Sequence, residues 1–239
     1  MLTLISLLLA MTTAPTLAPL GLAFPSSEGN LYIYHVGHAS LVLTWKGKVI
    51  HVDPYSEQAD YATLPKADLI LITHEHYDHL DKSAIAKIKK RSTKIIASKL
   101  AALELQGAQS LANGDGASWE DLRIDAVPAY NRVHKRDDGL PFHAKGAGNG
   151  YVLSFANLRL YVAGDTEDID EMGKLENIDI AFLPKNLPYT MTDEMFLRAA
   201  KMFRPKTLYA YHYFELDHFD QLAQELKKSG IALLMRNEK

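Results

Sequence analysis

Apolar residues gather in short runs from Leu31 onward, and polar or glycine-containing turns separate these runs. The stretch Asp68–Thr73 holds a continuous apolar run, which is typical of a strand buried on both faces. It leads into a helical pattern over Asp81–Lys90, with Asp81 as a suitable N-cap. Runs rich in β-branched and aromatic residues predict three earlier strands, at Leu31–Val36, Ser40–Trp45 and Lys48–Val52.

The second half of the chain repeats this order of strands followed by helices. Thr190 and Asp193 have the spacing of a capping box before a helical pattern, and a last helix is expected over Asp217–Lys228. The segments 106–118 and 131–150 are glycine-rich and predict irregular loops. Strands are expected at Leu122–Val127, Gly150–Phe155, Leu158–Val162, Ile178–Leu183 and Thr207–Tyr211. Two β-rich halves that each end in strand–helix units predict an α/β fold, a four-layer αββα sandwich.

The N-terminal stretch reads as an export signal. An apolar run from Leu2 to Met11 is too short to span a bilayer and precedes small residues and prolines. Cleavage after Ala18 or Ala23 would give a periplasmic or secreted protein, with a mature N-terminus expected near Phe24. A buried N-terminal segment or a retained anchor is the alternative. Residues 1–25 are therefore assigned to a signal peptide and residues 26–239 to a single domain.

Composition narrows the chemistry. The 239 residues are enough for one full core, and the formal net charge of −3 gives no basic face for a nucleic acid. The expected partner is a small-molecule substrate, and assembly into a homo-oligomer is left as an open alternative. Because the chain has no cysteine, any metal must be held by histidines and carboxylates.

Four potential metal ligands follow the apolar run that ends at Thr73. In the stretch "LILITHEHYDHLDKSAI", His74 and His76 point the same way in an extended loop and can share one ion, while Asp78 and His79 can reach a second ion after a turn. Two further candidates stand just after predicted strands, where ligands from several strands meet at one rim: Asp165 in "VAGDT" and His212 in "LYAYHYFE".

In this order, the six residues resemble the metallo-β-lactamase superfamily, whose signature is H-x-H-x-D-H followed by a later histidine, a bridging aspartate and a final histidine. The resemblance covers essentially the whole chain from Leu31 onward. The segments "VGHASLVL", "HVDP", "KADLILITHEHYDH", "VPAYN", "GNGYVL", "YVAGDT" and "LPYTM" are similar, more narrowly, to ascorbate-6-phosphate lactonases and, more distantly, to N-acylphosphatidylethanolamine phospholipases D.

The resemblance implies a binuclear hydrolase. Two divalent ions, zinc by preference although Mn, Fe or Ni also suit these ligands, would hold a water as hydroxide for attack on an ester, lactone, amide or phosphodiester. Asp165 would bridge the ions, and Asp78 would bind one of them and orient the water. His76 argues against the di-iron redox branch, which carries Glu at that position. A β-lactam is the least favoured substrate. The alternative is a non-catalytic metal-binding protein of the same fold.

One ligand of the first ion is missing from the expected place. In related proteins the third histidine follows a strand that ends in Pro-Ala, and here "VPAYN" puts Asn131 there. The following loop offers His134 and His143. We prefer His143, because nearby glycines permit a close approach of the backbone, whereas His134 lies in a charged run that suits solvent; Asn131 itself is the main competitor.

The neighbouring polar residues are expected to have supporting roles. Asn186 and Tyr189 in "NLPYTM" face the substrate or simply begin the next helix. His38 is expected to orient the loop beneath the site rather than to bind metal. Asp53 and Asp68 are candidates to accept hydrogen bonds from metal-binding imidazoles or to act as caps. The remaining histidines, His35, His51 and His218, are expected to be structural or solvated.

Overall fold

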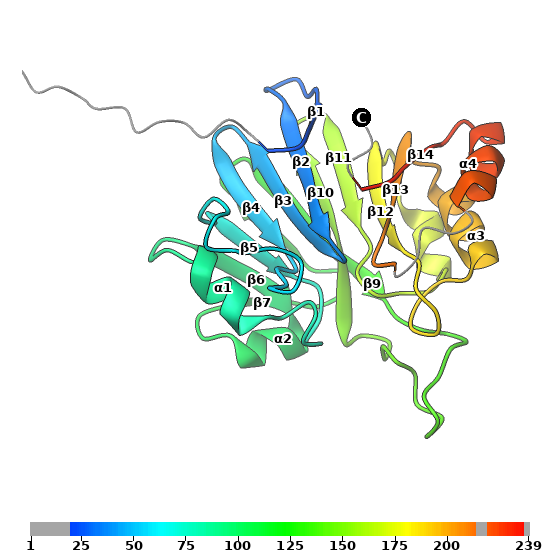
Figure 1. The fold of residues 1–239 in the computed structure, drawn as a ribbon, viewed down its shortest axis with the longest axis horizontal. Helices are drawn as coiled ribbons and strands as arrows, with labels where there is room; N and C mark the ends of the chain where they lie inside the picture. The colour runs from blue at the N-terminus through cyan, green and yellow to red at the C-terminus, as the bar shows by residue number, and fades with distance from the viewer. Residues whose placement is uncertain (1–19, 214–218, 237–239) are drawn as a thin grey trace, which may run out of the picture.

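Two seven-stranded mixed sheets pack face to face, and helices cover the outer face of each (Figure 1). The computed structural model describes residues 20–213 and 219–236. The first sheet has the order β1-β2-β3-β4-β5-β6-β7, with α1 (Lys82–Ile88) and α2 (Lys99–Glu104) outside it. Its strands are β1 (Leu22–Phe24), β2 (Leu31–Gly37), β3 (Ser40–Trp45), β4 (Lys48–Val52), β5 (Leu69–Ile72), β6 (Lys94–Ser98) and β7 (Gln109–Leu111).

The second sheet mirrors this arrangement with the order β14-β13-β12-β11-β10-β9-β8. On its outer face lie α3 (Asp193–Phe203) and α4 (Phe219–Lys228), and a short 3-10 helix, η1, spans Asp170–Lys174. Its strands are β8 (Gly116–Trp119), β9 (Leu122–Ala129), β10 (Gly148–Phe155), β11 (Leu158–Val162), β12 (Ile180–Pro184), β13 (Thr207–Tyr211) and β14 (Ala232–Leu234). The expected four-layer αββα sandwich is confirmed.

Three apolar layers explain why these runs fold as they do. In β5, Leu69 and Leu71 pack between the two sheets, while Ile70 and Ile72 pack under α1 and α2. This strand is therefore buried on both faces, as its unbroken apolar run predicts. A third layer lies between the second sheet and its helices, where Phe196 of α3 is fully buried.

Several boundaries differ from expectation. The segment 106–118 is not wholly irregular, because β7 and the start of β8 pair with neighbouring strands. The N-cap of α3 is Thr192, whose hydroxyl accepts from Met195 N; Thr190 instead donates to Asn186 Oδ1 at 2.7 Å, so the expected capping box is wrong. Asp81 does cap α1, accepting from Ser83 N and Ala84 N.

The N-terminal strand lies within the stretch assigned to the signal peptide. Leu22 and Phe24 pack against the core between the sheets, and β1 pairs antiparallel with β2. The folded part therefore begins before residue 26. Residues 1–19, which hold most of the expected signal, lie outside the described residues. Within the described part of the chain, no helix combines the length and apolar character needed to cross a membrane.

Candidate metal centre

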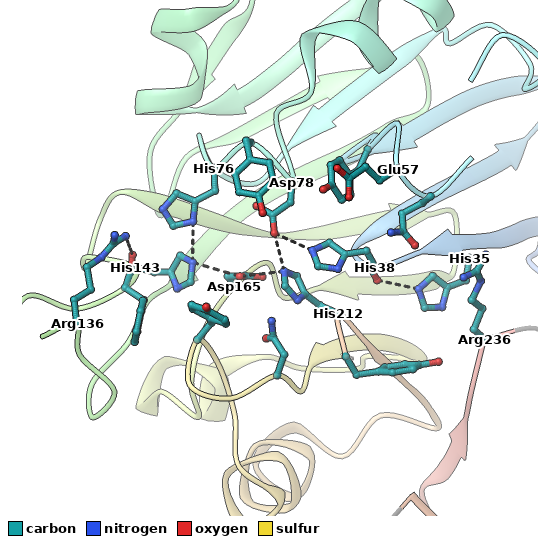
Figure 2. A pocket seen from close by; sticks show the side chains of 17 residues that line it. His35, His38, Glu57, His76, Asp78, Arg136, His143, Asp165, His212 and Arg236 are labelled. Atoms are coloured by element: carbon teal, nitrogen blue, oxygen red, sulfur yellow. Dashed lines mark hydrogen bonds and ion pairs between the residues drawn. The ribbon is translucent and has the colours of Figure 1, made fainter. Parts of the chain in front are cut away.

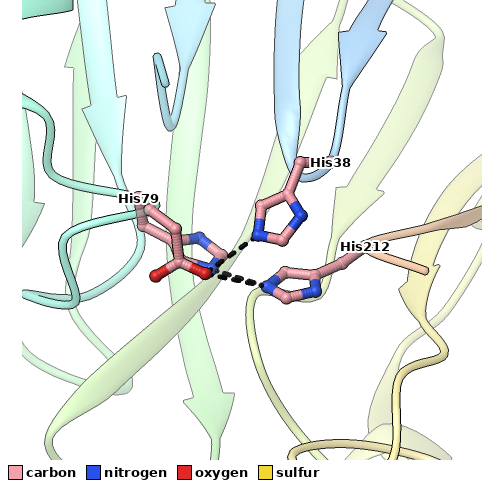
Figure 3. A group of neighbouring side chains, drawn as sticks. His38, His79 and His212 are labelled. Carbon is pink, nitrogen blue, oxygen red and sulfur yellow. Dashed lines mark hydrogen bonds and ion pairs between the residues drawn. The ribbon is translucent and has the colours of Figure 1, made fainter. Parts of the chain in front are cut away.

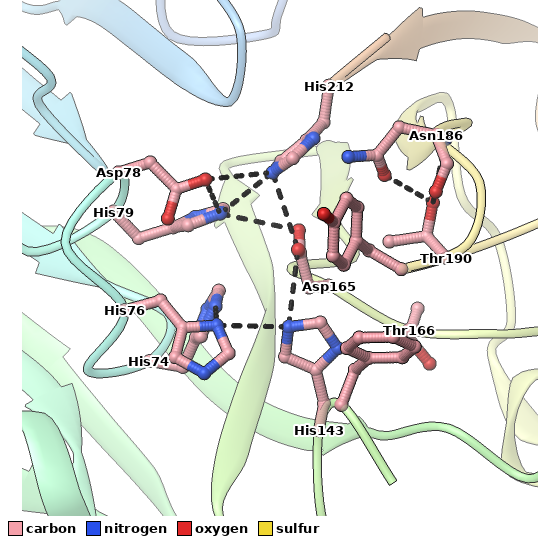
Figure 4. Close-up of polar contacts among 12 residues, drawn as sticks. His74, His76, Asp78, His79, His143, Asp165, Thr166, Asn186, Thr190 and His212 are labelled. Carbon is pink, nitrogen blue, oxygen red and sulfur yellow. Dashed lines mark hydrogen bonds and ion pairs between the residues drawn. The ribbon is translucent and has the colours of Figure 1, made fainter. Parts of the chain in front are cut away.

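The candidate ligand residues meet at one rim of the sandwich, and all of them except His143 follow a strand end or lie in a short turn. His74 and His76 come directly after β5. The carbonyl of His76 then accepts from the amides of His79 and Leu80, at 3.0 and 2.8 Å, which turns the chain toward α1. The turn places Asp78 and His79 on the opposite side of the loop from His76, as the sequence spacing predicts (Figure 4).

The first ligand group consists of His74, His76 and His143. His76 Nδ1 lies 3.1 Å from His74 Nε2 and 3.2 Å from His143 Nε2. The side chains of His74 and His143 are buried, and their ring nitrogens lie close enough together to hold one ion. His143 comes from the long loop between β9 and β10, far from the other two residues in the sequence.

The second ligand group consists of His38, Asp78, His79 and His212. Asp78 Oδ2 lies 2.9 Å from His38 Nε2 and 3.5 Å from His212 Nε2, and the Nε2 atoms of His79 and His212 are 3.0 Å apart. Figure 3 shows His38, His79 and His212 converging from three separate elements. His212 follows β13 directly, and His38 lies in the turn between β2 and β3.

Asp165 lies between the two groups. Its Oδ2 is 3.3 Å from His143 Nε2 and 3.3 Å from His212 Nε2, and its Oδ1 is 3.4 Å from His79 Nε2 (Figure 4). Gly164 makes this position possible: its φ is +66°, and a Cβ there would lie 2.7 Å from the carbonyl oxygen of Asn149. One carboxylate therefore faces histidines of both groups.

The electrostatics of these residues suit cations. Burial lowers the pKa of His74 and His79 well below the usual range, that of His143 to about 3 and that of His212 to about 4. These imidazoles are thus neutral near pH 7, so each has a ring nitrogen with a free lone pair.

The carboxylates complete the fit to divalent metals. Burial raises the pKa of Asp165 well above its usual range, and the nearby carboxylates of Asp78 and Asp53 raise it further. Within the described residues, the buried Oδ1 of Asp165 has no hydrogen-bond partner. A cation between the groups would neutralise this carboxylate and give the facing ring nitrogens a common partner. Histidine and carboxylate donors match the preferences of zinc and other first-row divalent ions.

Supporting contacts orient the histidines. Asp53 accepts from His79 Nδ1 at 2.8 Å and from Thr73 Oγ1 at 2.6 Å, so the hydrogen-bonding role predicted for Asp53 is confirmed. Asp68 serves elsewhere: it accepts from Val49 N at 2.9 Å and pairs with Lys90. Its expected role as an acceptor for a metal-binding imidazole is therefore wrong.

The three candidates for the missing ligand take different positions. Only His143 reaches the first group. Asn131 turns its Oδ1 to His143 Nδ1 at 2.7 Å, and His134 Nδ1 lies 2.8 Å from Glu167 Oε1. The preferred residue is thus the one that the structure brings to His74 and His76, and its metal binding stays a prediction.

Comparison with known proteins places this geometry in a family. A sequence profile described as "Beta-lactamase superfamily domain" matches residues 32–212, which include all of the residues in both groups. The chain belongs to the metallo-β-lactamase superfamily. A relative from Koribacter versatilis, named a UPF0173 metal-dependent hydrolase, is 32% identical over 77% of this chain and 84% of its own length. The chain therefore belongs to the UPF0173 metal-dependent hydrolases within the superfamily.

Solved structures of this superfamily agree. A protein from Parabacteroides distasonis, provisionally described as a metal-dependent hydrolase, is 47% identical, with a TM-score of 0.86 over 93% of this chain and 100% of its own. The metallo hydrolase Igni18 from Ignicoccus hospitalis is 26% identical, with a TM-score of 0.69 over 87% of this chain and 96% of its own. The family and the fold thus rest on similarity over most of the chain and not on the histidine spacing alone.

A cavity of about 750 Å³ adjoins both ligand groups and is lined by members of each, together with Asp165 (Figure 2). Asn186 and Tyr189, the residues expected to face substrate, both line it. Asn186 is buried, and its Nδ2 has no hydrogen-bond partner among the described residues. Figure 4 shows this nitrogen turned toward the side where His212 lies. Arg136 and Arg236 line opposite ends of the cavity (Figure 2).

His38 is the site residue that sequence reasoning placed beneath the site rather than in it. Its carbonyl does support the loop, accepting from His212 N at 2.9 Å and from His35 Nε2 at 3.1 Å. Its imidazole, however, belongs to the second group. The sequence carries no local signal for this, because it depends on how the two sheets meet. The other histidines behave as expected where described: His51 Nε2 donates to Pro65 O at 2.9 Å, and His218 lies outside the described residues.

Proposed function

We propose that this metallo-β-lactamase superfamily member is a binuclear hydrolase that cleaves an ester, lactone or phosphodiester bond of a small substrate. The observation that carries the proposal is the position of Asp165, whose two oxygens lie 3.3 to 3.4 Å from histidines of both ligand groups. A site for one ion would need no such shared carboxylate.

The first ion would be held by His74, His76 and His143, and the second by Asp78, His79 and His212, with Asp165 between them. His38, the fourth member of the second group, would support Asp78 through its 2.9 Å contact rather than bind the ion. Zinc is favoured by these ligands, with Mn, Fe and Ni as alternatives. When bound, the ions supply an acidified water and polarise the substrate carbonyl or phosphoryl oxygen.

Asp78 is the residue suited to orient the attacking water. Burial alone would raise the pKa of its carboxyl, but the contacts with His212 and His38 lower it far below the usual range. Asp78 is therefore ionised at neutral pH and accepts hydrogen bonds. It also lines the open cavity, where a water and a substrate can reach it.

Asn186 is suited to bind the substrate. Its Oδ1 is occupied by the hydroxyl of Thr190 at 2.7 Å, which fixes the amide and leaves Nδ2 as a donor at the cavity wall. Such a donor can hydrogen-bond an oxygen that gains negative charge in the transition state. Tyr189 forms the neighbouring wall with its ring 5.0 Å from that of Phe142.

The local similarity of the sequence to ascorbate-6-phosphate lactonases supports testing lactones first. The assay uses purified protein loaded with Zn or Mn and offers a lactone, a chromogenic phosphodiester and a β-lactam. We expect turnover of the lactone or the phosphodiester and little of the β-lactam. The competing function, a non-catalytic metal-binding protein, predicts full metal loading without turnover of any of them.

Asp78→Asn provides the test of mechanism. The amide keeps the shape of the side chain but lacks the negative charge that would hold an ion and orient the water, so we expect turnover to fall by about 10²- to 10⁴-fold while the fold is retained. Asn186→Ala should lower kcat with a smaller effect, and circular dichroism checks folding in both. Undiminished turnover by Asp78→Asn would refute the role of Asp78.

Export is a further part of the proposal. Cleavage after Ala18 would leave β1 intact, whereas cleavage after Ala23 would remove Leu22 and Ala23 from a strand paired with β2. We therefore place the cut upstream of Leu22. N-terminal sequencing of the protein recovered from a secreting host should return a start shortly after Ala18, and a start at Met1 would contradict export.

A further inference from the structure

His143 stands on a segment that has little regular structure of its own. Between the end of β9 at Ala129 and the start of β10 at Gly148, the described chain forms no strand or helix, only an isolated bridge between Lys135 and Pro141. By contrast, His74 and His76 follow β5 directly. Something other than secondary structure must hold the His143 ring in place.

Asn131 makes the direct contact with this ring. Its Oδ1 accepts from the backbone amide of His143 at 2.8 Å and lies 2.7 Å from His143 Nδ1. Its Nδ2 donates to the carbonyl of Tyr189 at 2.8 Å and to Glu167 Oε1 at 3.1 Å. A backbone amide can only donate and a carbonyl can only accept, so these partners fix which end of the Asn131 amide is oxygen.

The orientation of Asn131 determines the tautomer of His143. An amide oxygen can only accept, so the proton of the neutral imidazole must sit on Nδ1. Nε2 is then left with its lone pair, and it is the nitrogen that lies 3.2 Å from His76 Nδ1 and 3.3 Å from Asp165 Oδ2. The opposite tautomer would present a proton to the metal centre.

Glu167 holds Asn131 and the turn that follows it. This fully buried carboxylate accepts from the backbone amides of Arg132, Val133 and His134 at 2.7 to 2.8 Å, as well as from Asn131 Nδ2. The backbone amide of Glu167 donates to Tyr130 O at 3.0 Å. Glu167 itself lies two residues after Asp165 in the chain.

We propose that Glu167 is a positioning residue of the metal centre, which acts through Asn131 to fix the ring and the tautomer of His143. The proposal rests on the metal-binding role proposed above for His143. The family resemblance expects a metal ligand at the position of Asn131. Here Asn131 instead accepts a hydrogen bond from His143, the residue proposed to be that ligand. Because Glu167 follows Asp165 by two residues, its contacts also link the loop to the segment that carries Asp165.

The experiment reads the tautomer of His143 directly. Long-range ¹H–¹⁵N NMR of histidine-labelled wild-type protein, metal-free and zinc-loaded, should show His143 with its proton on Nδ1 in both states. In Glu167→Gln, the amide group cannot accept from every donor around it, so we expect a mixture of tautomers. Titration with zinc should show one of two ions bound about 10- to 100-fold more weakly, with the other unchanged.

Asp168→Asn is the matched control. Asp168 is also a buried carboxylate beside the loop, but it pairs with Arg132 at 3.3 Å and Arg198 at 2.7 Å and does not contact Asn131. This variant should keep the tautomer of His143 and both zinc affinities. Should Glu167→Gln fail to fold, Asn131→Leu removes, at similar volume, the acceptor of His143 Nδ1 through which Glu167 acts, and should weaken the same ion.

The outcomes separate this proposal from the proposed function. A wild-type His143 protonated on Nε2 would overturn the positioning role, as would wild-type zinc affinities in Glu167→Gln or an equal loss in Asp168→Asn. Wild-type protein that never binds two ions would instead contradict the binuclear function.

Discussion

The two ligand groups of the metal centre are built differently. The residues of the second group follow a strand end or lie in a short turn: His38, Asp78, His79 and His212. Asp53 orients His79 through a 2.8 Å contact with its Nδ1. In the first group, His74 and His76 lie in the loop after β5 that also holds Asp78 and His79, whereas His143 lies in the long irregular segment between β9 and β10. One group is thus positioned mainly by the sheets, the other by side-chain hydrogen bonds that reach back to Glu167.

This difference shows where metal affinity can be tuned. Ligands on strand ends are fixed by the packing of the whole sandwich, so few single substitutions can move them without loss of the fold. A ligand on a loop depends on a small number of polar contacts, and each of these can be altered alone. We therefore expect the first ion to be the more sensitive of the two to mutations outside the ligand set.

Asp165→Asn should have the largest effect, because Asp165 is the residue that the two groups share. The amide keeps the volume but removes the charge that faces three imidazoles, so we expect both ions to bind at least about 100-fold more weakly. Isothermal titration with zinc measures this. Loss of only one ion would show that the carboxylate belongs to one group alone.

His143→Ala should remove one ion and leave the other. The paired substitution His134→Ala is the control, because His134 faces Glu167 and not the ligand group. Elemental analysis after reconstitution should give about one metal per chain for His143→Ala and about two for His134→Ala. Full loading of His143→Ala would return Asn131 to consideration as the ligand.

His38→Asn should have a moderate effect confined to the second group. His38 contacts Asp78 Oδ2 at 2.9 Å, and its ring centroid lies 3.7 Å from that of His212, so its removal loosens both residues. We expect about 10-fold weaker binding of one ion and lower turnover. An effect as large as that of His79→Ala would instead make His38 a ligand in its own right.

His51 lies outside both groups, so its substitution should leave metal binding unchanged and affect only the pH dependence of folding stability. Burial lowers its pKa to about 4, below the usual 6.5 of the unfolded chain, so as the pH falls through this window the unfolded state binds the proton first. The neutral, buried imidazole thus costs up to about 3 kcal/mol of stability at pH 4 relative to pH 7. Urea unfolding of metal-free protein should lose less stability over this range in His51→Gln than in wild type; equal losses would contradict the assignment.

The strands whose residues carry strong local signals were predictable. β5 is an unbroken apolar run, and the predicted cap Asp81 does begin the next helix, α1. β7 and β8 were not, because three or four residues such as Gln109–Leu111 carry no periodicity and form strands only through pairing with a neighbour. α2 was not predicted for the same reason, because its six residues are too few to show a helical periodicity.

Within the site, order along the chain predicted the residues at strand ends, because strands of one sheet edge bring their ends together. The loop was harder. Glycines favoured His143 over His134, but nothing in the sequence shows that Asn131 and Glu167 would hold its ring. His38 was underestimated because its membership in the second group depends on how the two sheets meet, a tertiary feature with no local signature.

The central claim is that two ligand groups joined by Asp165 hold two ions. Elemental analysis of wild-type protein, stripped of metal and then reconstituted with zinc to saturation, tests it most directly. The account predicts close to two zinc ions per chain. One ion per chain at saturation, or none, would contradict it.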